Sequence, residues 1–208
     1  MNYSEETWIG WMDRLAEQDY VVIDDFISDE EYAKIMGFFD EAEKNDKLRK
    51  AGIGTQQDFQ LKAEVRGDFI YWLDEKRDQE LSFFFDLKDE LIQSLKRYCY
   101  LSLSGSEFHI AKYPAGTYYH RHLDQFNEST NRQITVLLYL NKEWKKGDGG
   151  ELVIYKDGED ITVEPISKRL LLFKSDTVEH EVLITNVPRY SLTGWLLHQP
   201  ANVGYLLR

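Results

Sequence analysis

One short segment, from Tyr113 to Asp124, constrains this chain more than any other. It reads Tyr-Pro-Ala-Gly-Thr-Tyr-Tyr-His-Arg-His-Leu-Asp and ends in His122-x-Asp124. In an extended segment the side chains of residues two apart point to the same side. The His122 imidazole and the Asp124 carboxylate are therefore expected to project together. They are candidate ligands of a metal ion whose remaining ligand comes from a neighbouring strand.

A second histidine, His180 in the run Val178-Glu-His-Glu-Val182, is the candidate third ligand. The interval after Asp124 is long enough to return the chain on a facing strand. Two histidines and one carboxylate on one face of a metal, with the opposite positions open, are typical of non-haem Fe(II) oxygenases. The three residues therefore predict an iron centre with room for a chelating cosubstrate and O2.

A lone cation follows this set, Arg189 in the run Arg189-Tyr-Ser-Leu-Thr-Gly-Trp195. A 2-oxo acid can occupy two positions on the iron, and a guanidinium can bind its second carboxylate through two hydrogen bonds. A hairpin bend at 186–188 would put Arg189 on the strand adjacent to His180, pointing inward. The phenol of Tyr139 could bind the same carboxylate. The other side chains expected to line this pocket are Tyr113, Thr193 and Trp195.

His120 allows a different interpretation of the same segment. It precedes His122 by two residues, and a cupin-type metal site uses a His-x-His pair. A binding module built on His120 and His122 therefore stays open at this point, although it would not require a cation after the distal histidine. The two remaining histidines, His109 and His198, have no comparable neighbours and are expected to be structural.

The composition indicates a folded, acidic protein. The chain has 208 residues, enough for one domain with a substantial core, and its 13 Tyr, 11 Phe and 5 Trp argue against extended disorder. Its formal net charge of -12 argues against a nucleic acid as the main partner, because phosphate binding needs clustered Lys and Arg. A basic or neutral protein segment is a more suitable partner.

The cysteine count and the hydropathy pattern bear on the compartment. Cys99 is the single cysteine, so no disulfide can form within the chain. The first residues lack the basic-then-apolar pattern of a secretory signal, and no apolar run approaches membrane-spanning length. We expect a protein of the reducing cytoplasm with no membrane partner.

Helical patterns occupy the first half of the chain, and strand patterns the second. Helices are expected over 5–17, from Ser28 onward and over 78–100, and strands at 21–23, 69–73, 107–113, 132–140, 151–155, 161–164, 169–174, 178–184 and 189–198. Ser28 and Glu31 form a predicted capping box. The order predicts an α+β, mainly β fold in one domain: helical support over 1–100 and an antiparallel double sheet over about 105–200.

Several motifs recur here in the order and spacing of a known family. They are Val65-Arg-Gly-Asp68-x-Ile-x-Trp72, Tyr113-Pro, Tyr119-x-Arg-His122-x-Asp124, Tyr139-Leu-Asn-Lys-x-Trp144, Gly149-Gly-x-Leu152, Arg169-Leu-Leu-Leu-Phe173, His180-Glu-Val182 and Arg189-Tyr-x-x-Thr193-x-Trp195. Together they resemble the prolyl hydroxylase domain oxygenases of the oxygen-sensing (Egl-nine) type, particularly their small bacterial homologues. One departure is Gly194, which stands where the animal members carry a bulkier residue.

The resemblance implies a double-stranded β-helix, or jelly roll, and protein prolyl 4-hydroxylase activity. Fe(II), 2-oxoglutarate and O2 would be required, and ascorbate could stimulate. It implies iron ligation by His122, Asp124 and His180, and binding of the distal carboxylate of 2-oxoglutarate by Arg189 and Tyr139. It also implies a loop that closes over a peptide substrate, between residues 51 and 66. Residues expected to contact or order the substrate are Arg66, Asp68, Tyr119 and Arg121.

The target protein is not fixed by the resemblance. Bacterial relatives suggest a translation elongation factor, and animal relatives a transcription factor. The same chemistry on a free amino acid or on another side chain stays an alternative, as does the cupin-like module. A nucleic-acid demethylase is disfavoured by the acidic charge.

Overall fold

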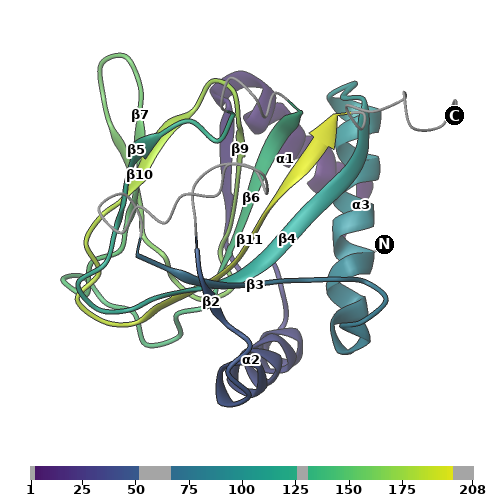
Figure 1. The fold of residues 1–208 in the computed structure, drawn as a ribbon. Helices are drawn as coiled ribbons and strands as arrows, with labels where there is room; N and C mark the ends of the chain where they lie inside the picture. Colours follow the sequence, from purple (N-terminus) through teal and green to yellow (C-terminus); the bar gives the residue numbers. More distant parts are fainter. Residues whose placement is uncertain (1–2, 52–66, 126–130, 199–208) are drawn as a thin grey trace, which may run out of the picture.

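The computed structural model describes residues 3–51, 67–125 and 131–198. Within these ranges two β-sheets face each other, and helices cover the outer side of the larger one (Figure 1). No helix within these ranges has the length and apolar character that crossing a membrane requires.

The helices begin and end where local chemistry favours it. They are α1 (Glu5–Gln18), α2 (Asp29–Lys44), the 3-10 turn η1 (Gln79–Leu81) and α3 (Ser82–Tyr98). The predicted capping box is present at α2: the Glu31 amide donates to the Ser28 hydroxyl, and the Ser28 amide donates to the Glu31 carboxylate. All three predicted helices are confirmed, and Cys99 is the half-buried residue that ends α3.

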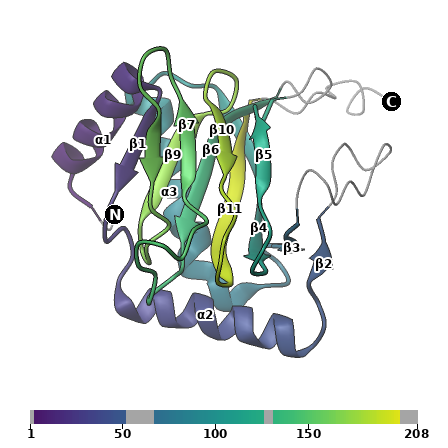
Figure 2. The same cartoon turned by 90° about the vertical axis from the view of Figure 1, so that its left-hand side faces the viewer.

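The strands form two sheets in which the named strands pair antiparallel. The larger sheet has the order β1 (Tyr20–Ile23), β9 (Leu170–Lys174), β6 (Arg132–Tyr139), β11 (Arg189–His198), β4 (Leu103–Tyr113), β3 (Phe69–Trp72) and β2 (Arg49–Lys50). The smaller sheet has the order β5 (Tyr119–His122), β10 (Glu179–Val182), β7 (Leu152–Tyr155) and β8 (Ile161–Val163). Figure 2 looks onto the smaller sheet, with the larger one behind it. This is the expected double-stranded β-helix.

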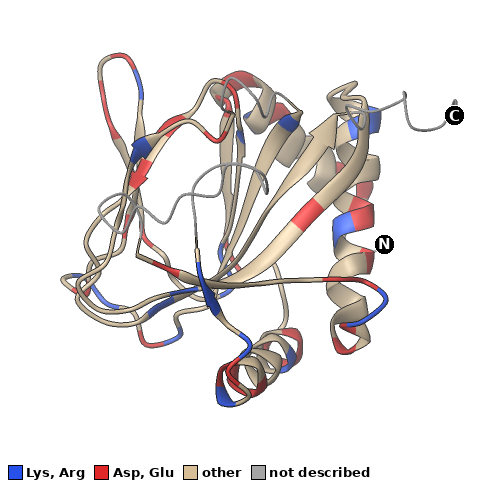
Figure 3. Cartoon of the chain, in the orientation of Figure 1, with Lys and Arg blue, Asp and Glu red and all other residues tan. Residues whose placement is uncertain are grey.

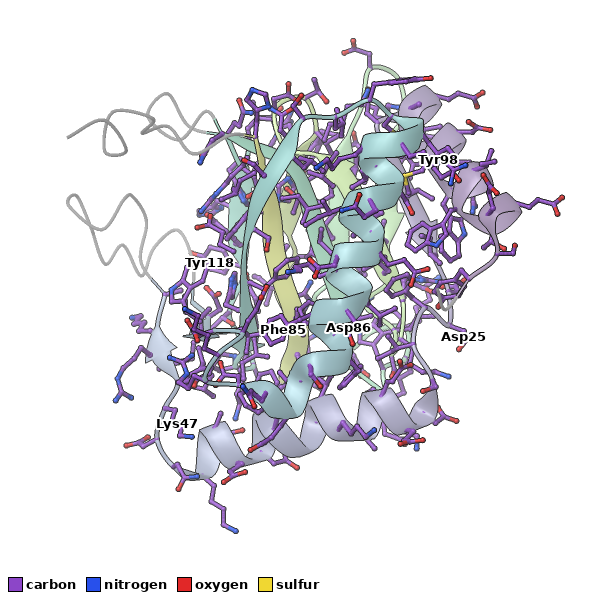
Figure 4. The ribbon with its side chains drawn as sticks, turned by 90° about the vertical axis from the view of Figure 1, so that its right-hand side faces the viewer. Asp25, Lys47, Phe85, Asp86, Tyr98 and Tyr118 are labelled. Atoms are coloured by element: carbon purple, nitrogen blue, oxygen red, sulfur yellow. The ribbon has the colours of Figure 1, made fainter. Side chains whose placement is uncertain are left out.

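The strands of the larger sheet are nearly continuous hydrophobic runs because apolar layers cover both of its faces. Along β6, Val136 and Leu138 face the helices, whereas Leu137 and Tyr139 face the smaller sheet. A strand that is buried on both faces has no solvent side to alternate with. On the helical side, α3 lies across the larger sheet with its apolar stripe inward (Figure 4). Charged side chains lie mainly on the outer helices and the connecting turns (Figure 3).

Gly194 is explained by the strand next to it. A Cβ built at this position would lie 2.2 Å from the Phe108 ring and 2.3 Å from the Glu107 carbonyl oxygen on β4. Phe108 in turn packs edge-on against Phe84 of α3, with ring centroids 5.1 Å apart. The volume that a larger residue at 194 would need is therefore taken by Phe108, and Gly194 points to the helical core.

One expectation about topology is wrong. The bend at 186–188 does not produce a hairpin, because β10 belongs to the smaller sheet and β11 to the larger one. Arg189 is therefore on the sheet that faces His180, where it pairs with Tyr113 of β4. The bend carries the chain from one sheet to the other, and both residues still point into the space between the sheets.

Candidate metal centre

Three side chains meet at one end of the space between the sheets. His122 on β5 is paired directly opposite His180 on β10, and Asp124 follows β5 by two residues. One potential ligand atom from each side chain lies within 4.8 Å of the other two. His122 Nε2 is 3.4 Å from Asp124 Oδ1, and His180 Nε2 is 3.8 Å from Asp124 Oδ2. The geometry suits one cation shared by all three.

Backbone carbonyls fix the orientation of both imidazoles. The Nδ1–H of His122 donates to the His120 carbonyl oxygen at 2.6 Å, and that of His180 donates to the Val178 carbonyl oxygen at 3.1 Å. With Nδ1 protonated, Nε2 of each ring keeps its lone pair and is directed at Asp124. A ring held through its far nitrogen in this way is the usual support of a metal-binding histidine.

Neighbouring rings hold the same two imidazoles from the side. Tyr119 stacks on His122 with centroids 3.8 Å apart and planes inclined at 22°. Phe173 packs against His180 with centroids 4.6 Å apart. Tyr119, expected to contact substrate, therefore lies beside a candidate ligand.

Burial and mutual attraction set the protonation states of the cluster. Burial lowers the pKa of His180 to about 4, against the opposing attraction of Asp124, so its imidazole is neutral at neutral pH. Burial alone would raise the pKa of Asp124, but the His180 and His122 imidazoles and the Thr135 hydroxyl outweigh it and hold that pKa well below its usual range. A neutral imidazole and an ionised carboxylate are the forms that bind metals.

A cavity opens directly beside the cluster. It has about 440 Å³ of empty space, including its open mouth, and contains the three clustered side chains in its wall. The predicted pocket residues Tyr113, Arg189, Thr193 and Trp195 also line it, as does Tyr119. Tyr139 is not among the lining residues; it lies behind them, beside the Arg189 guanidinium.

Arg189 and Tyr139 present unused donors in this region. Arg189 is 1% exposed, and its Nε donates to the Gly150 carbonyl oxygen at 2.8 Å. Its guanidinium carbon lies 5.0 Å from the Tyr113 ring centroid and 5.1 Å from that of Tyr139. Among the described residues, neither Arg189 Nη2 nor the Tyr139 hydroxyl has a hydrogen-bond partner, although both are buried. Burial also raises the pKa of Tyr139, so its phenol stays protonated.

Buried donors without acceptors are costly unless a ligand satisfies them. A guanidinium and a phenol together suit an anionic group, and a carboxylate is the natural partner of the guanidinium fork. The cavity thus combines a cation site with an anion site, as a metal-chelating dicarboxylate requires. The donor set fits iron and 2-oxoglutarate.

Other predicted residues lie elsewhere. Arg66 is outside the described residues, as is most of the expected substrate loop. Asp68 is fully buried just before β3. Arg121 lies on the outer side of the smaller sheet, where it pairs with Glu179 at 2.5 Å and covers the Tyr155 ring. In the described structure Arg121 is therefore not part of the cavity.

Several residues of the wall were not assigned to it from the sequence, and two of them are polar groups close to the expected site. His109 was expected to be structural, yet it lines the cavity between Trp72 and Trp195, with ring centroids 4.8 and 5.5 Å away. Thr135 lines it as well, and its even spacing from Tyr139 along β6 was a signal for a shared face.

The structure does not favour the cupin-like alternative. The His120 side chain is exposed and packs against Tyr118, with centroids 4.7 Å apart. Among the described residues, the potential ligand group around His122 consists of His122, Asp124 and His180, and does not include His120.

Comparison with known proteins agrees with this geometry. Residues 108–197 match the family model of the 2OG-Fe(II) oxygenase superfamily. A prolyl-4-hydroxylase from Pseudomonas putida is 29% identical over 93% of this chain and 100% of its own, with a TM-score of 0.84. A prolyl hydroxylase from Trichoplax adhaerens, solved with a peptide fragment of the hypoxia inducible factor oxygen degradation domain, is 25% identical over 93% of this chain and 90% of its own, with a TM-score of 0.85.

A more distant relative supports the fold alone. A prolyl 4-hydroxylase from Phytophthora capsici is 24% identical over 100% of this chain and 70% of its own, with a TM-score of 0.75. The family match spans the strands from β4 to β11, which carry the clustered ligands and Arg189. The chain therefore carries a 2OG-Fe(II) oxygenase domain over residues 108–197 and is a dioxygenase of the prolyl hydroxylase type.

Proposed function

We propose that this protein is a prolyl 4-hydroxylase of protein substrates. It would couple the oxidative decarboxylation of 2-oxoglutarate by O2 to the hydroxylation of a prolyl residue. The observation that carries the proposal is the convergence of a His-Asp-His cluster and a buried arginine on one cavity. Similarity to two prolyl hydroxylases along nearly the whole chain supports the choice of proline.

The clustered side chains have separate roles in this proposal. His122, Asp124 and His180 hold Fe(II) through two neutral imidazoles and one carboxylate. Arg189 and Tyr139 bind the distal carboxylate of 2-oxoglutarate, which satisfies the donors left without acceptors. When bound, Fe(II) and 2-oxoglutarate supply the oxidising chemistry with O2.

The remaining wall residues position the reactants. Tyr113 and Thr193 offer hydroxyls within the cavity, and Thr193 is also hydrogen-bonded to the Ser191 hydroxyl at 3.0 Å. Trp195 contributes an almost buried ring to the same wall. These side chains exclude water and hold the cosubstrate in one orientation.

A protein substrate suits the chain better than a free amino acid. The Trichoplax relative was solved with a peptide. The exposed Trp72 ring adjoins the wall at His109 and offers an extended partner an apolar contact. With a net charge of -12, the enzyme suits a neutral or basic segment, and a translation elongation factor is our candidate. We propose the cytoplasm as its location, and one oxygenase domain over residues 1–208.

Mapping new hydroxyprolines tests this function. The purified protein, incubated with Fe(II), 2-oxoglutarate and host lysate under air, is expected to add one oxygen to a proline of a specific protein, as read by peptide mass spectrometry. A His122→Ala variant in a parallel incubation is the control. Oxygen added to another residue type, or to free amino acids alone, would favour the alternative oxygenase.

Replacing Gly150 by alanine is expected to weaken 2-oxoglutarate binding without affecting the metal site. Its φ is +76°, and an added Cβ would lie 2.8 Å from Arg189 Cδ. Displacement of the guanidinium would raise the KM for 2-oxoglutarate about tenfold if it removed roughly 1.4 kcal/mol of binding. Steady-state kinetics with varied 2-oxoglutarate measure this change.

Gly158→Ala is the matched control. Gly158 also has a positive φ, of +110°, but an added Cβ would meet nothing within 4 Å. This variant is expected to lose about 1–2 kcal/mol of folding stability from backbone strain and to keep its KM. Equal KM changes in the two variants would mean that Gly150 acts through strain and not through Arg189.

A further inference from the structure

A chain of buried hydroxyls ends on the Asp124 carboxylate. Thr135 Oγ1 donates to Asp124 Oδ2 at 2.7 Å, and Thr135 Oγ1 and Ser175 Oγ are 2.8 Å apart. A hydroxyl has one hydrogen, and that of Thr135 is used on Asp124. Ser175 is therefore the donor to Thr135. The three residues are 0–5% exposed, so water does not compete with these bonds.

The hydroxyl chain connects the two sheets. Thr135 belongs to β6 and Ser175 directly follows β9, both in the larger sheet, whereas Asp124 follows β5 of the smaller one. Backbone bonds support the same contact, because the Gln125 amide donates to the Ser175 carbonyl oxygen at 3.1 Å and the Ser175 amide to that of Gln133 at 3.0 Å. Asp124 lies beyond the last residue of its own strand, so its position depends on the opposite sheet.

A neutral hydroxyl donates to this carboxylate, and no lysine or arginine among the described residues forms an ion pair with it. The nearest arginine in its hydrogen-bond network, Arg132, reaches only the Asp124 backbone carbonyl, at 3.5 Å, and pairs with Glu107 at 2.7 Å. A hydroxyl orients an anion without neutralising it, so the full charge stays available for a cation. Thr135 occupies Oδ2, which leaves Oδ1 on the side of His122 Nε2.

We propose that Thr135 and Ser175 are positioning residues for the metal centre: they fix the Asp124 carboxylate so that one oxygen is held and the other is presented to the metal. This inference rests on the proposed function of the His-Asp-His cluster and extends it to two residues outside the ligand set. Loss of the Thr135 hydroxyl lets the carboxylate turn, and metal binding weakens even when all three ligands are present. Replacing residues that orient ligands typically weakens metal binding about 10–100-fold.

Metal affinity without cosubstrate gives a direct test. Mn(II) titrations followed by electron paramagnetic resonance are expected to show a dissociation constant roughly 10–100-fold higher for Thr135→Val, which keeps the shape but not the hydroxyl. Thr135→Ser restores a donor and is expected to bind Mn(II) as the wild type does. Ser175→Ala, which removes the second donor only, is expected to give a smaller loss.

Two comparisons keep the outcomes distinct. If the wild type fails to bind Mn(II), or binds it as His180→Ala does, the proposed metal site itself is wrong. If the wild type binds and His180→Ala does not, but Thr135→Val retains wild-type affinity, the positioning role is wrong. Equal losses in Thr135→Ser and Thr135→Val would also overturn it, since packing and not the hydroxyl would be responsible. Circular dichroism establishes folding, and Thr135→Ala replaces Thr135→Val if the latter does not fold.

Discussion

Replacing His122 by alanine is expected to abolish 2-oxoglutarate turnover. The variant loses one of three ligands that converge within 4.8 Å, and with it the ring that stacks on Tyr119. Replacing a residue that only orients a ligand weakens metal binding roughly 10–100-fold. Loss of a ligand itself should therefore weaken metal binding by more than about 100-fold. Isothermal titration with Mn(II) and an assay of succinate formation measure the two effects.

His120→Ala is the matched control for this experiment. It removes the same side chain from the same strand, but His120 is exposed and packs beside Tyr118. Metal affinity and turnover are expected to stay at wild-type levels. If His120→Ala abolished metal binding and His122→Ala did not, the assignment of the ligands would be contradicted.

Arg189→Ala is expected to act on the cosubstrate and to spare the metal. The guanidinium is 1% exposed, and leaving a buried carboxylate without its charged partner costs about 2–5 kcal/mol. That corresponds to an increase of roughly 30- to 4,000-fold in the KM for 2-oxoglutarate, at about 1.4 kcal/mol per tenfold. Mn(II) binding in the absence of cosubstrate should change little, because the three ligands are untouched. Turnover at increasing 2-oxoglutarate concentrations measures the effect.

Arg189→Lys separates charge from geometry. Lysine keeps the positive charge but lacks the planar fork that binds a carboxylate at two points and donates to Gly150. An intermediate KM is therefore expected. Arg97→Ala is the control, since Arg97 is an exposed residue of α3 paired with Glu5. An unchanged KM for 2-oxoglutarate in Arg189→Ala would show that Arg189 does not bind the distal carboxylate.

The elements of the fold were largely predictable, because their signals are local. Ser28 and Glu31 specify the start of α2 through bonds within one helical turn. Repeated apolar runs indicated the strands of the second half. The pairing of strands was harder, and the bend before Arg189 was interpreted as a hairpin. The residues of that bend do not determine that β10 and β11 belong to different sheets, because sheet membership depends on pairing with strands that are distant in the sequence.

In the candidate site, too, residues with a local sequence signal were predictable, and residues defined by contacts between distant segments were not. His122 and Asp124 were identified from their spacing, and Arg189 from its position after His180. Thr135, Ser175 and Gly150 were not, although Thr135 contacts Asp124, Gly150 contacts Arg189, and Ser175 contacts Thr135. A threonine in a β-strand and a serine in a turn are ordinary residues. Their roles come from contacts between the two sheets, which no local pattern contains.

The direct pairing of His180 with His122 has a consequence for how the site comes into existence. A slip of one residue between β5 and β10 would turn one imidazole to the outside, so the wrong alignment carries no binding site. An ion that binds only the correct alignment adds its binding free energy to that alignment alone. Iron present while the chain folds would then selectively stabilise the correct register of β5 and β10, before any oxygen chemistry begins.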